Sequence, residues 1–213
     1  MNRNNILKNN RWIMLLLLGF SLPVCSGCYL EDLVKSILNN YYPEAETVQI
    51  LILPPYPIAS SGAVDSKVVG SFTSASDIKS GLTAGVHKFN QASSKTQVQA
   101  VWHTSKEVRS FYENQLLAAS KECKKNNTPF DLKKVCRDYI TELKRDGEQD
   151  LNCIIFGIFT YTPNATAYSV SLHYYDIQAD NIAQVRGVVS KEESRERGEA
   201  LSKLLQTLLE KVY

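Results

Sequence analysis

The alternation of apolar and polar residues predicts a strand, a helix and a second strand in the first half of the chain. The apolar run from Val48 to Leu53 ends at two prolines, which favours a buried strand over a helix. Apolar residues recur at helical spacing over residues 78–89, and residues 96–102 alternate with the period of a strand. Because a helix joins these two strands, we expect them to lie parallel in one sheet.

Capping residues mark the beginnings of the later helices. Thr104 and Glu107 have the spacing of a capping box, which predicts a helix that ends at an Asn-Asn-Thr-Pro break. Asp131 then begins a second helix. Ser190 and Glu193 form another capping-box pattern, and we expect the terminal helix to begin there.

Three further strands are predicted before the terminal helix. Residues 152–161 are strongly apolar, residues 167–176 alternate, and residues 182–189 form a third strand interrupted by Gly187. Short turns separate them, which predicts antiparallel pairing. The sequence therefore predicts an α/β (α+β) domain over residues 47–213. We expect a single mixed β-sheet in the order β-α-β-α-α-β-β-β-α, with helices packed on the sheet and a short helix before it.

The segment from Tyr56 to Ser74 has no clear period and is rich in serine and glycine, which predicts a long loop. It also holds more apolar residues than a loop without contacts requires. We expect them either to bind a partner protein or to cover one end of the core. The candidate partner-binding residues are Tyr56, Ile58, Val64, Val68, Val69 and Phe72.

The first 27 residues have the pattern of an export signal. Three basic residues precede an apolar run of about a dozen residues, shorter than the ~20 that a membrane-spanning helix needs. The run ends in Cys25-Ser26-Gly27-Cys28, which resembles the lipobox of bacterial lipoproteins, although that pattern prefers Leu, Val or Ile in place of Cys25. The resemblance implies that Cys28 becomes the lipid-modified N-terminus. The alternative is an ordinary secretory signal cleaved near Gly27.

The residues after Cys28 bear on where the protein would be held. In lipoproteins of double-membraned bacteria, an Asp after the modified cysteine is the usual inner-membrane retention signal, and this chain has Tyr29. The resemblance therefore implies an outer-membrane lipoprotein facing the periplasm, if the host has an outer membrane. Residues 28–46 would hold the anchor, an amphipathic helix over 30–42 and a short linker. The apolar stripe of that helix either lies on the lipid surface or docks on the domain.

Composition and charge exclude several classes of protein. The chain has 213 residues, of which 44% are hydrophobic and 22% charged, so it has room for one globular domain and a short appendage. Its formal net charge is +2, but residues 1–27 carry three basic and no acidic residues, and the remainder has 21 basic against 22 acidic residues. Binding nucleic acid needs a clustered cationic surface. We therefore expect no nucleic-acid partner.

The cysteines suit an exported protein. Cys123 and Cys136 fall in two predicted helices joined by a turn, and a disulfide between them is geometrically feasible in an oxidising periplasm. Cys153 lies in an apolar strand, where it is expected to be a small buried hydrophobe. No pair has the C-x-x-C spacing of a zinc or redox motif. We expect no metal site and no bound cofactor.

The three histidines, His87, His103 and His173, do not have the spacing of zinc ligands. His103 follows the end of a predicted parallel strand, which is where α/β proteins form sites. An exported hydrolase that uses His103 with a serine or carboxylate brought near by folding is therefore one alternative function. It requires His103 within hydrogen-bond reach of such a group in a cleft. A small-ligand carrier, which requires an enclosed apolar pocket, is another.

Five segments in a fixed order carry a family resemblance. They are Ile50-Leu51-Ile52-Leu53-Pro54, Gly81-Leu82, Val101-Trp102, Ile154-Ile155-Phe156-Gly157-Ile158 and Leu172-His173-Tyr174-Tyr175-Asp176. Their order resembles that of the amino-terminal domain of TolB, to which the flagellar lipoprotein FlgO, the curli protein CsgG and the penicillin-binding-protein activator LpoB are similar. The resemblance covers residues 47–212 and implies a lipoprotein that binds other proteins and is not an enzyme.

Two departures from these relatives refine the expected function. The predicted hairpin arms belong to the core sheet, so the membrane-inserting hairpins of CsgG-like pores have no counterpart in the predicted elements. Only residues 41–46 separate the first helix from the first strand, so a long arm like that of LpoB is not expected. We therefore expect an accessory factor in a flagellar, secretion or cell-wall assembly that stays near its membrane, with other envelope proteins as partners.

Overall fold

The computed structural model describes residues 45–59, 76–147, 150–162 and 166–213, which belong to one compact unit that begins at Ala45. The leader, Cys28 and the helix expected over 30–42 lie outside the described residues. Within the described residues, no helix is both long enough and apolar enough to cross a membrane. The elements are β1 (Glu46–Ile52), β2 (Tyr56–Ala59), α4 (Ser76–Ala92), β3 (Thr96–Val101), α5 (Ser105–Arg109), the π-helix η1 (Ser110–Leu117), α6 (Ala118–Asn126), α7 (Leu132–Arg145), β4 (Cys153–Tyr161), β5 (Ala167–Asp176), β6 (Asn181–Ser190) and α8 (Ser194–Val212).

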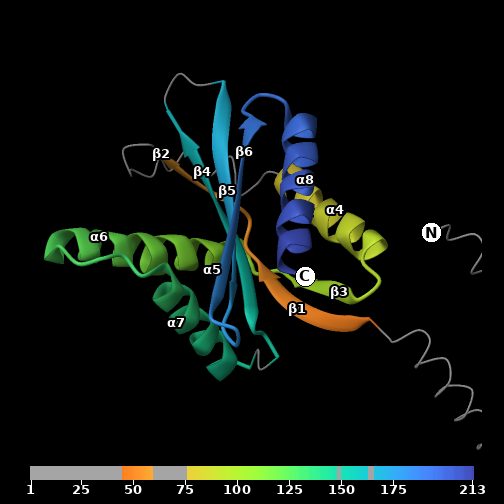
Figure 1. Cartoon of the computed structure of the whole chain (residues 1–213). Coiled ribbons are helices and arrows are strands. Elements are labelled where there is room, and N and C mark those ends of the chain that lie inside the picture. Colours follow the sequence, from red (N-terminus) through yellow and green to blue (C-terminus); the bar gives the residue numbers. More distant parts are fainter. Residues whose placement is uncertain (1–44, 60–75, 148–149, 163–165) are drawn as a thin grey trace, which may run out of the picture. The chain divides into compact units, whose positions relative to one another are not determined.

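The strands form one mixed sheet in the order β3-β1-β4-β5-β6, with β2 alongside β4 (Figure 1). The β1–β3 and β1–β4 pairs are parallel, whereas β4, β5 and β6 are antiparallel neighbours. These pairings confirm the predicted fold class and the parallel and antiparallel halves of the sheet. They follow from the connections, because α4 lies between β2 and β3 along the chain, while only a few residues separate β4 from β5 and β5 from β6.

The prediction of a loop from Tyr56 to Ser74 is wrong at its start, because residues 56–59 form strand β2. β1 pairs with β4 through Ile50–Ile52, and β2 pairs with the later part of β4 through Tyr56–Ala59. Between them, Pro54 and Pro55 interrupt the path along β4. A four-residue strand that itself contains a proline, Pro57, has too little alternation to be recognised from its sequence.

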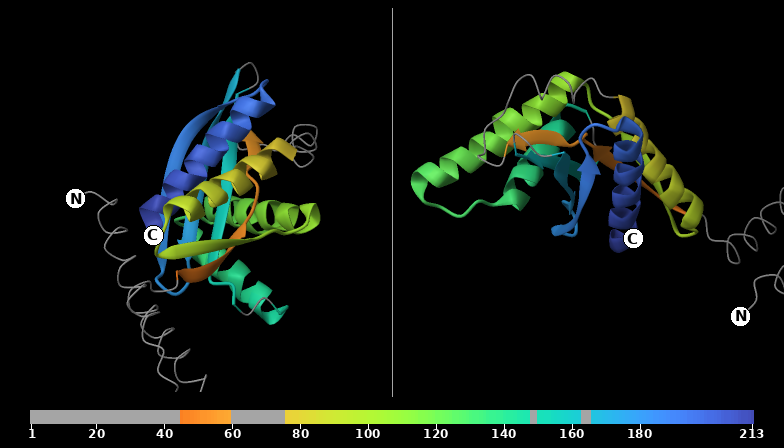
Figure 2. Two further views of the ribbon diagram at one scale, coloured as in Figure 1. Left: turned by 90° about the vertical axis from the view of Figure 1, so that its right-hand side faces the viewer. Right: turned by 90° about the horizontal axis from the view of Figure 1, so that it is seen from above.

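Two layers of helices cover the sheet (Figures 1 and 2). Helices α4 and α8 pack together on one face, where Gly81 and Gly198 allow their backbones to approach closely. A Cβ added to Gly81 would lie 2.5 Å from the carbonyl oxygen of Gly198. The opposite layer contains α5, η1, α6 and α7, which bury Phe111, Tyr112 and Tyr139 against the other face. The core is therefore split into two apolar clusters, one on each side of the sheet.

The helix beginnings agree with the sequence at two of three positions. Thr104 and Glu107 form a complete capping box, and the Asp131 side chain accepts the backbone N–H of Lys134. The prediction for the last helix is wrong, because α8 begins four residues after Ser190 and its N-cap is Glu193. Ser190 is the last residue of β6, and its hydroxyl accepts the Glu193 N–H within the turn instead.

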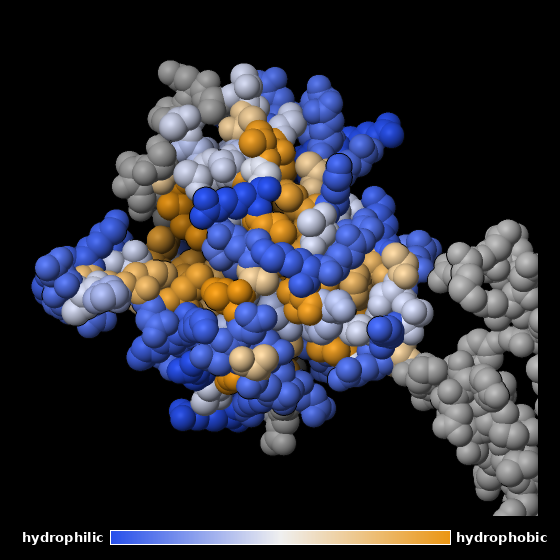
Figure 3. Space-filling view, in the orientation of Figure 1, coloured by the Kyte–Doolittle hydropathy of each residue, from blue (hydrophilic) through white to orange (hydrophobic). Residues whose placement is uncertain are grey.

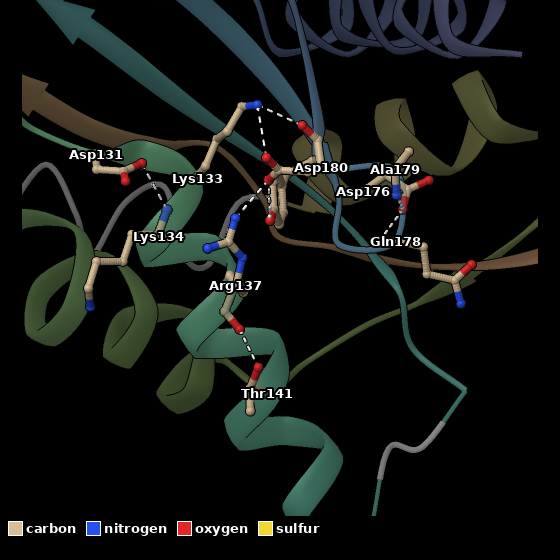
Figure 4. A network of polar contacts seen from close by, with 10 residues as sticks. Asp131, Lys133, Lys134, Arg137, Thr141, Asp176, Gln178, Ala179 and Asp180 are labelled. Atoms are coloured by element: carbon tan, nitrogen blue, oxygen red, sulfur yellow. Dashed lines mark hydrogen bonds and ion pairs between the residues drawn. The ribbon is translucent and has the colours of Figure 1, made fainter.

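Asp180 ties the β5–β6 turn to α7 (Figure 4). Its carboxylate accepts hydrogen bonds from Arg137 Nη2 at 2.8 Å and from the Tyr175 hydroxyl at 3.1 Å. Lys133 Nζ donates to the Asp180 carbonyl oxygen at 2.6 Å. The bond from Arg137 is the main reason that the pKa of Asp180 falls below its usual value. This contact holds α7 over the lower half of the sheet, away from the upper half.

Candidate functional site

The layer of α5, η1 and α7 covers only part of its face of the sheet, and Tyr56 marks the boundary. The Tyr56 ring stacks on Tyr112 of η1, with ring centroids 4.8 Å apart. Its hydroxyl donates to the Glu113 carboxylate. Burial, helped by Glu113, raises the pKa of Tyr56 well above its usual value. Tyr56 is therefore the last fully buried side chain of β2 on this face, and Ile58, the next residue on the same side, is half-buried.

Beyond that boundary, four neighbouring strands present a surface that no described helix covers, and we call it the open face. The pairing register aligns Ile58 with Thr160, Thr160 with Ser169, and Ser169 with Val188. The preceding row aligns Ile158 with Ser171, and Ser171 with Arg186. Paired residues point to the same side of a sheet. The open face therefore consists of Ile58, Ile158, Thr160, Ser169, Ser171, Arg186 and Val188.

Exposure confirms that no described helix covers this surface. Val188 is 68% exposed, and Thr160, Ser169 and Arg186 are also exposed. Ile58 and Ile158 are half-buried. In Figure 1 the upper halves of β4, β5 and β6 extend above α5 and α6, and Figure 3 shows apolar surface in that region with hydrophilic residues between. An exposed valine that shares a face with half-buried isoleucines forms an apolar patch of the kind found at contact surfaces.

His173 lies where the open face meets the covered half. Its ring stacks on Phe156 at 5.0 Å, and its Nε2 lies 3.2 Å from the Ser171 hydroxyl. Burial, together with the nearby Arg186, lowers the pKa of His173 to about 4. His173 is therefore neutral at physiological pH, and Arg186 supplies the positive charge of the open face. A surface of hydroxyls, aliphatic side chains and one cation is suited to contact with another protein.

The structure separates the predicted partner-binding residues. Tyr56 is 1% exposed and cannot touch a partner in this conformation, because it fills the space between β2 and η1. Ile58 belongs to the open face. Val64, Val68, Val69 and Phe72 lie outside the described residues, as does the predicted lipidation site, Cys28.

The cysteines predicted to form a disulfide are both free thiols in the structure. Cys136 is fully buried on the inner side of α7, whereas Cys123 lies on α6 at the hollow between the two helices. Burial raises the pKa of Cys136 to about 12, and that of Cys153 to about 11. Cys153 is the buried small residue that its strand predicts. The Cys123–Cys136 bond stays a prediction.

His103 does not have the geometry that the hydrolase alternative requires. Its Nδ1 lies 3.9 Å from the Glu107 carboxylate, beyond hydrogen-bond distance, and 3.4 Å from the Tyr139 hydroxyl. Burial raises the pKa of Tyr139, so this phenol stays protonated and is a poor nucleophile. Within the described residues, no three His, Cys, Asp or Glu side chains converge to hold a metal ion.

A second surface feature is the hollow between α6 and α7, of about 560 Å³. Phe130, 41% exposed, lies at its outer end. α6 buries none of its own side chains and projects away from the sheet in Figure 1. Polar and apolar side chains line this hollow together and it opens to solvent, unlike the enclosed apolar pocket that a small-ligand carrier needs.

Sequence reasoning missed the open face, although one signal pointed to it. In residues 167–176, Ser169 and Ser171 lie on the polar side of the alternation. This indicates that their side of the strand does not face a fully apolar core. Which residues of β2, β4 and β6 join them depends on strand register. The sequence pattern contains no information on where the helical layer stops.

The fold and the open face define a class: an α/β protein with one mixed sheet, helices on both faces, and a part of one face that no described helix covers. No family model and no curated protein matches the chain. Among solved structures, it is similar to lipoprotein GNA1162 from Neisseria meningitidis, with 11% identity over 78% of this chain and 96% of that one, at a TM-score of 0.34. The LpoB C-terminal domain from Salmonella enterica shares 9% identity over 75% and 94%, at 0.30. The PelC dodecamer from Paraburkholderia phytofirmans shares 7% over 79% and 88%, at 0.33. LpoB is one of the proteins that the sequence resembles.

Proposed function

We propose that this chain is a lipid-anchored protein of the bacterial envelope that binds other envelope proteins and catalyses no reaction. The observation that carries the binding role is the open face. An exposed valine, two half-buried isoleucines and three hydroxyl side chains line up across four strands there. Such a surface gains free energy when a partner covers its apolar side chains.

The location and the anchor in this proposal come from the sequence. A basic and then apolar leader ends at the Cys25-Ser26-Gly27-Cys28 segment, which supports lipid attachment at Cys28 and an outer-membrane position facing the periplasm. Val64, Val68, Val69 and Phe72 stay in the proposed contact surface because they follow Ile58 closely along the chain. The resemblance to FlgO, CsgG and LpoB supports an accessory role in a flagellar, secretion or cell-wall assembly.

Site-specific photo-crosslinking in the native envelope tests the contact surface. A photoreactive amino acid at Ser169, in the centre of the open face, is expected to give a protein adduct that mass spectrometry identifies. The matched control is Thr207, which is exposed on α8 on the opposite side of the sheet. Equal adducts at both positions, or an adduct at Thr207 alone, would contradict a partner site on the open face.

Substitution tests whether the adduct reflects binding. Thr160→Arg with Ser169→Arg places two bulky charges on the open face at positions that are already exposed, so folding should be preserved. We expect recovery of the identified partner to fall at least ten-fold, while Thr207→Arg leaves it unchanged. Unchanged recovery with both variants would show that the partner binds elsewhere.

The anchor has its own test. Metabolic labelling with a fatty-acid analogue should mark the full chain and not its Cys28→Ser variant. Equal labelling of the two would place the lipid elsewhere or remove the anchor from the proposal.

A further inference from the structure

Strand β6 is a long and regular edge of the sheet. Its ten residues pair with β5 in continuous register from Asn181 to Ser190, without a bulge. In the part of the chain that the structure describes, no strand pairs with the other side of β6. In Figure 1 β6 forms the near edge of the sheet, and seen from above in Figure 2 it lies between α8 and the side of α6 and α7.

Such an edge usually carries protection against pairing with another chain. Proteins place prolines, lysines, bulges or a covering segment along edge strands for this purpose. β6 contains no proline and no lysine, and Arg186 is its one charged residue. α8 does pack on β6, with Leu204 against Gly187, but this contact covers a face of the strand. At the edge itself, Lys211 Nζ of α8 donates to the Gln184 carbonyl oxygen at 3.3 Å, an exposed contact that a further strand would have to displace. The other outward backbone N–H and C=O groups of β6 have the geometry to accept a further strand.

We propose that β6 pairs antiparallel with β6 of a second copy of this chain, about a two-fold axis at Val185. In this register Val185 lies opposite Val185 of the second copy. Gln184 lies opposite Arg186 of the second copy, and Ile182 lies opposite its Val188. A two-fold axis makes each of these contacts twice. Two six-stranded sheets thereby join into one.

Charge and side-chain size favour this register over the two neighbouring symmetric ones. The amide oxygen of Gln184 already accepts a hydrogen bond from Arg186 within the chain, at 3.4 Å, so the same pair of groups is compatible across the axis. An axis at Arg186 would place two arginines directly opposite each other, which is destabilising. An axis at Gln184 would leave Val188 opposite the turn residue Asp180, with no strand residue to cover it.

The pairing also accounts for the exposure of Val188. This side chain is 68% exposed in the single chain, whereas Ile182 is half-buried against the cluster that contains Phe156 and Tyr175. Placing them opposite each other extends that apolar cluster across the axis. A register shifted by an odd number of residues would place opposite each other two side chains that point to different faces of the sheet. The pleat of the strands forbids such a pairing.

This inference goes beyond the proposed function, because self-association needs no envelope partner. It is tested by disulfide trapping in the full chain with Cys25, Cys28 and Cys123 changed to Ser. The two remaining native thiols, Cys136 and Cys153, are buried. Val185→Cys is expected to form a covalent dimer under mild oxidation, because residues directly opposite in a sheet have Cβ atoms about 4.5–5.5 Å apart.

Neighbouring positions supply matched controls for the register. Gln184→Cys and Arg186→Cys, each alone, should give at least ten-fold less dimer than Val185→Cys. An equal mixture of the two should give a mixed dimer, since these positions oppose each other across the axis. Strongest self-crosslinking at position 184 or 186 would overturn the register.

Sedimentation of the unoxidised chain tests the association itself. Val188→Glu changes a side chain that is exposed in the single chain, so the fold should be kept, as circular dichroism will verify. We expect it to weaken the dimer at least ten-fold, whereas Thr207→Glu on α8 does not. A chain that stays monomeric up to several hundred micromolar, or equal dimerisation of Val188→Glu, would overturn the proposal. Partner recovery with the open-face variants is measured separately, so the two proposals fail independently.

Discussion

The hydroxyl of Tyr112 accepts the backbone N–H of Gly157 at 2.9 Å and donates to the carbonyl oxygen of Pro54 at 3.0 Å. It thereby fills the gap where Pro54 and Pro55 interrupt the path of β1 and β2 along β4. A side chain from the π-helix η1 takes the place of a backbone partner. The wider winding of η1 brings Phe111, Tyr112 and Leu116 to the same inner face.

Tyr112→Phe should destabilise the protein although it removes only one oxygen atom. The Gly157 N–H would stay buried without a partner, and the carbonyl of the half-buried Pro54 would lose its donor, which costs about 1–3 kcal/mol in total. Urea unfolding measures the free energy of unfolding, and Tyr161→Phe is the control because Tyr161 is half-buried at the end of β4. Losses of the same size in the two variants would show that the gap is not held by Tyr112.

Gly81→Ala should separate α4 from α8. The added Cβ would lie 2.5 Å from the Gly198 carbonyl oxygen, and neither backbone can yield without moving its helix. We expect a loss of about 2–3 kcal/mol in the free energy of unfolding, in the upper range for overpacked cores. Gly198→Ala is the matched comparison, since its nearest contact is 3.3 Å from Asp77 O, and its loss should be smaller. The prediction is wrong if Gly198→Ala costs more.

Stability should decrease in mildly acidic solution because of His173. Its folded pKa of about 4 lies below its ordinary value of 6.5, so the unfolded chain binds a proton between these values and the folded chain does not. The free energy of unfolding is therefore highest above pH 6.5 and falls as the pH drops towards 4, by about 2 kcal/mol between pH 7.5 and 5.

His173→Gln should remove this part of the pH dependence. Urea unfolding at pH 7.5 and 5.0 compares it with the unchanged chain and with His87→Gln, in which an exposed histidine is replaced. The His87→Gln curve is expected to follow that of the unchanged chain. If His173→Gln loses as much stability at pH 5 as the unchanged chain, the buried neutral histidine is not the cause.

Thiol labelling should distinguish Cys123 from the other two described cysteines. At pH 8, pKa values of about 12 and 11 leave Cys136 and Cys153 almost entirely protonated, and both are buried. A thiol reagent followed by peptide mass spectrometry should mark Cys123 in the folded chain and all three after denaturation. After oxidation, loss of label at Cys123 together with a Cys123–Cys136 linked peptide would instead establish the predicted disulfide.

Local patterns were sufficient to predict most of the elements. The Thr104–Glu107 capping box and the cap at Asp131 fixed the starts of two helices, because a cap depends on residues three apart. Ser190 had the same pattern but ended a strand, since its backbone continues the pairing of β6 with β5. Neither β2 nor the π-winding of η1 has a local signature, because each depends on contacts with β4 and with Pro54.

The sequence by itself determined the mixed sheet, its parallel and antiparallel halves, and the basic and apolar leader that ends at Cys28. These depend on local periodicity and on the lengths of connections. Only the tertiary structure decided that Tyr56 is buried beneath η1, that Ile58, Ser169 and Val188 share one surface that no described helix covers, and that β6 is the last of the described strands at its side of the sheet. The physical reason is that strand register and the extent of a covering helical layer arise from contacts between residues far apart in the chain. The local alternation of apolar and polar residues carries no information on such contacts.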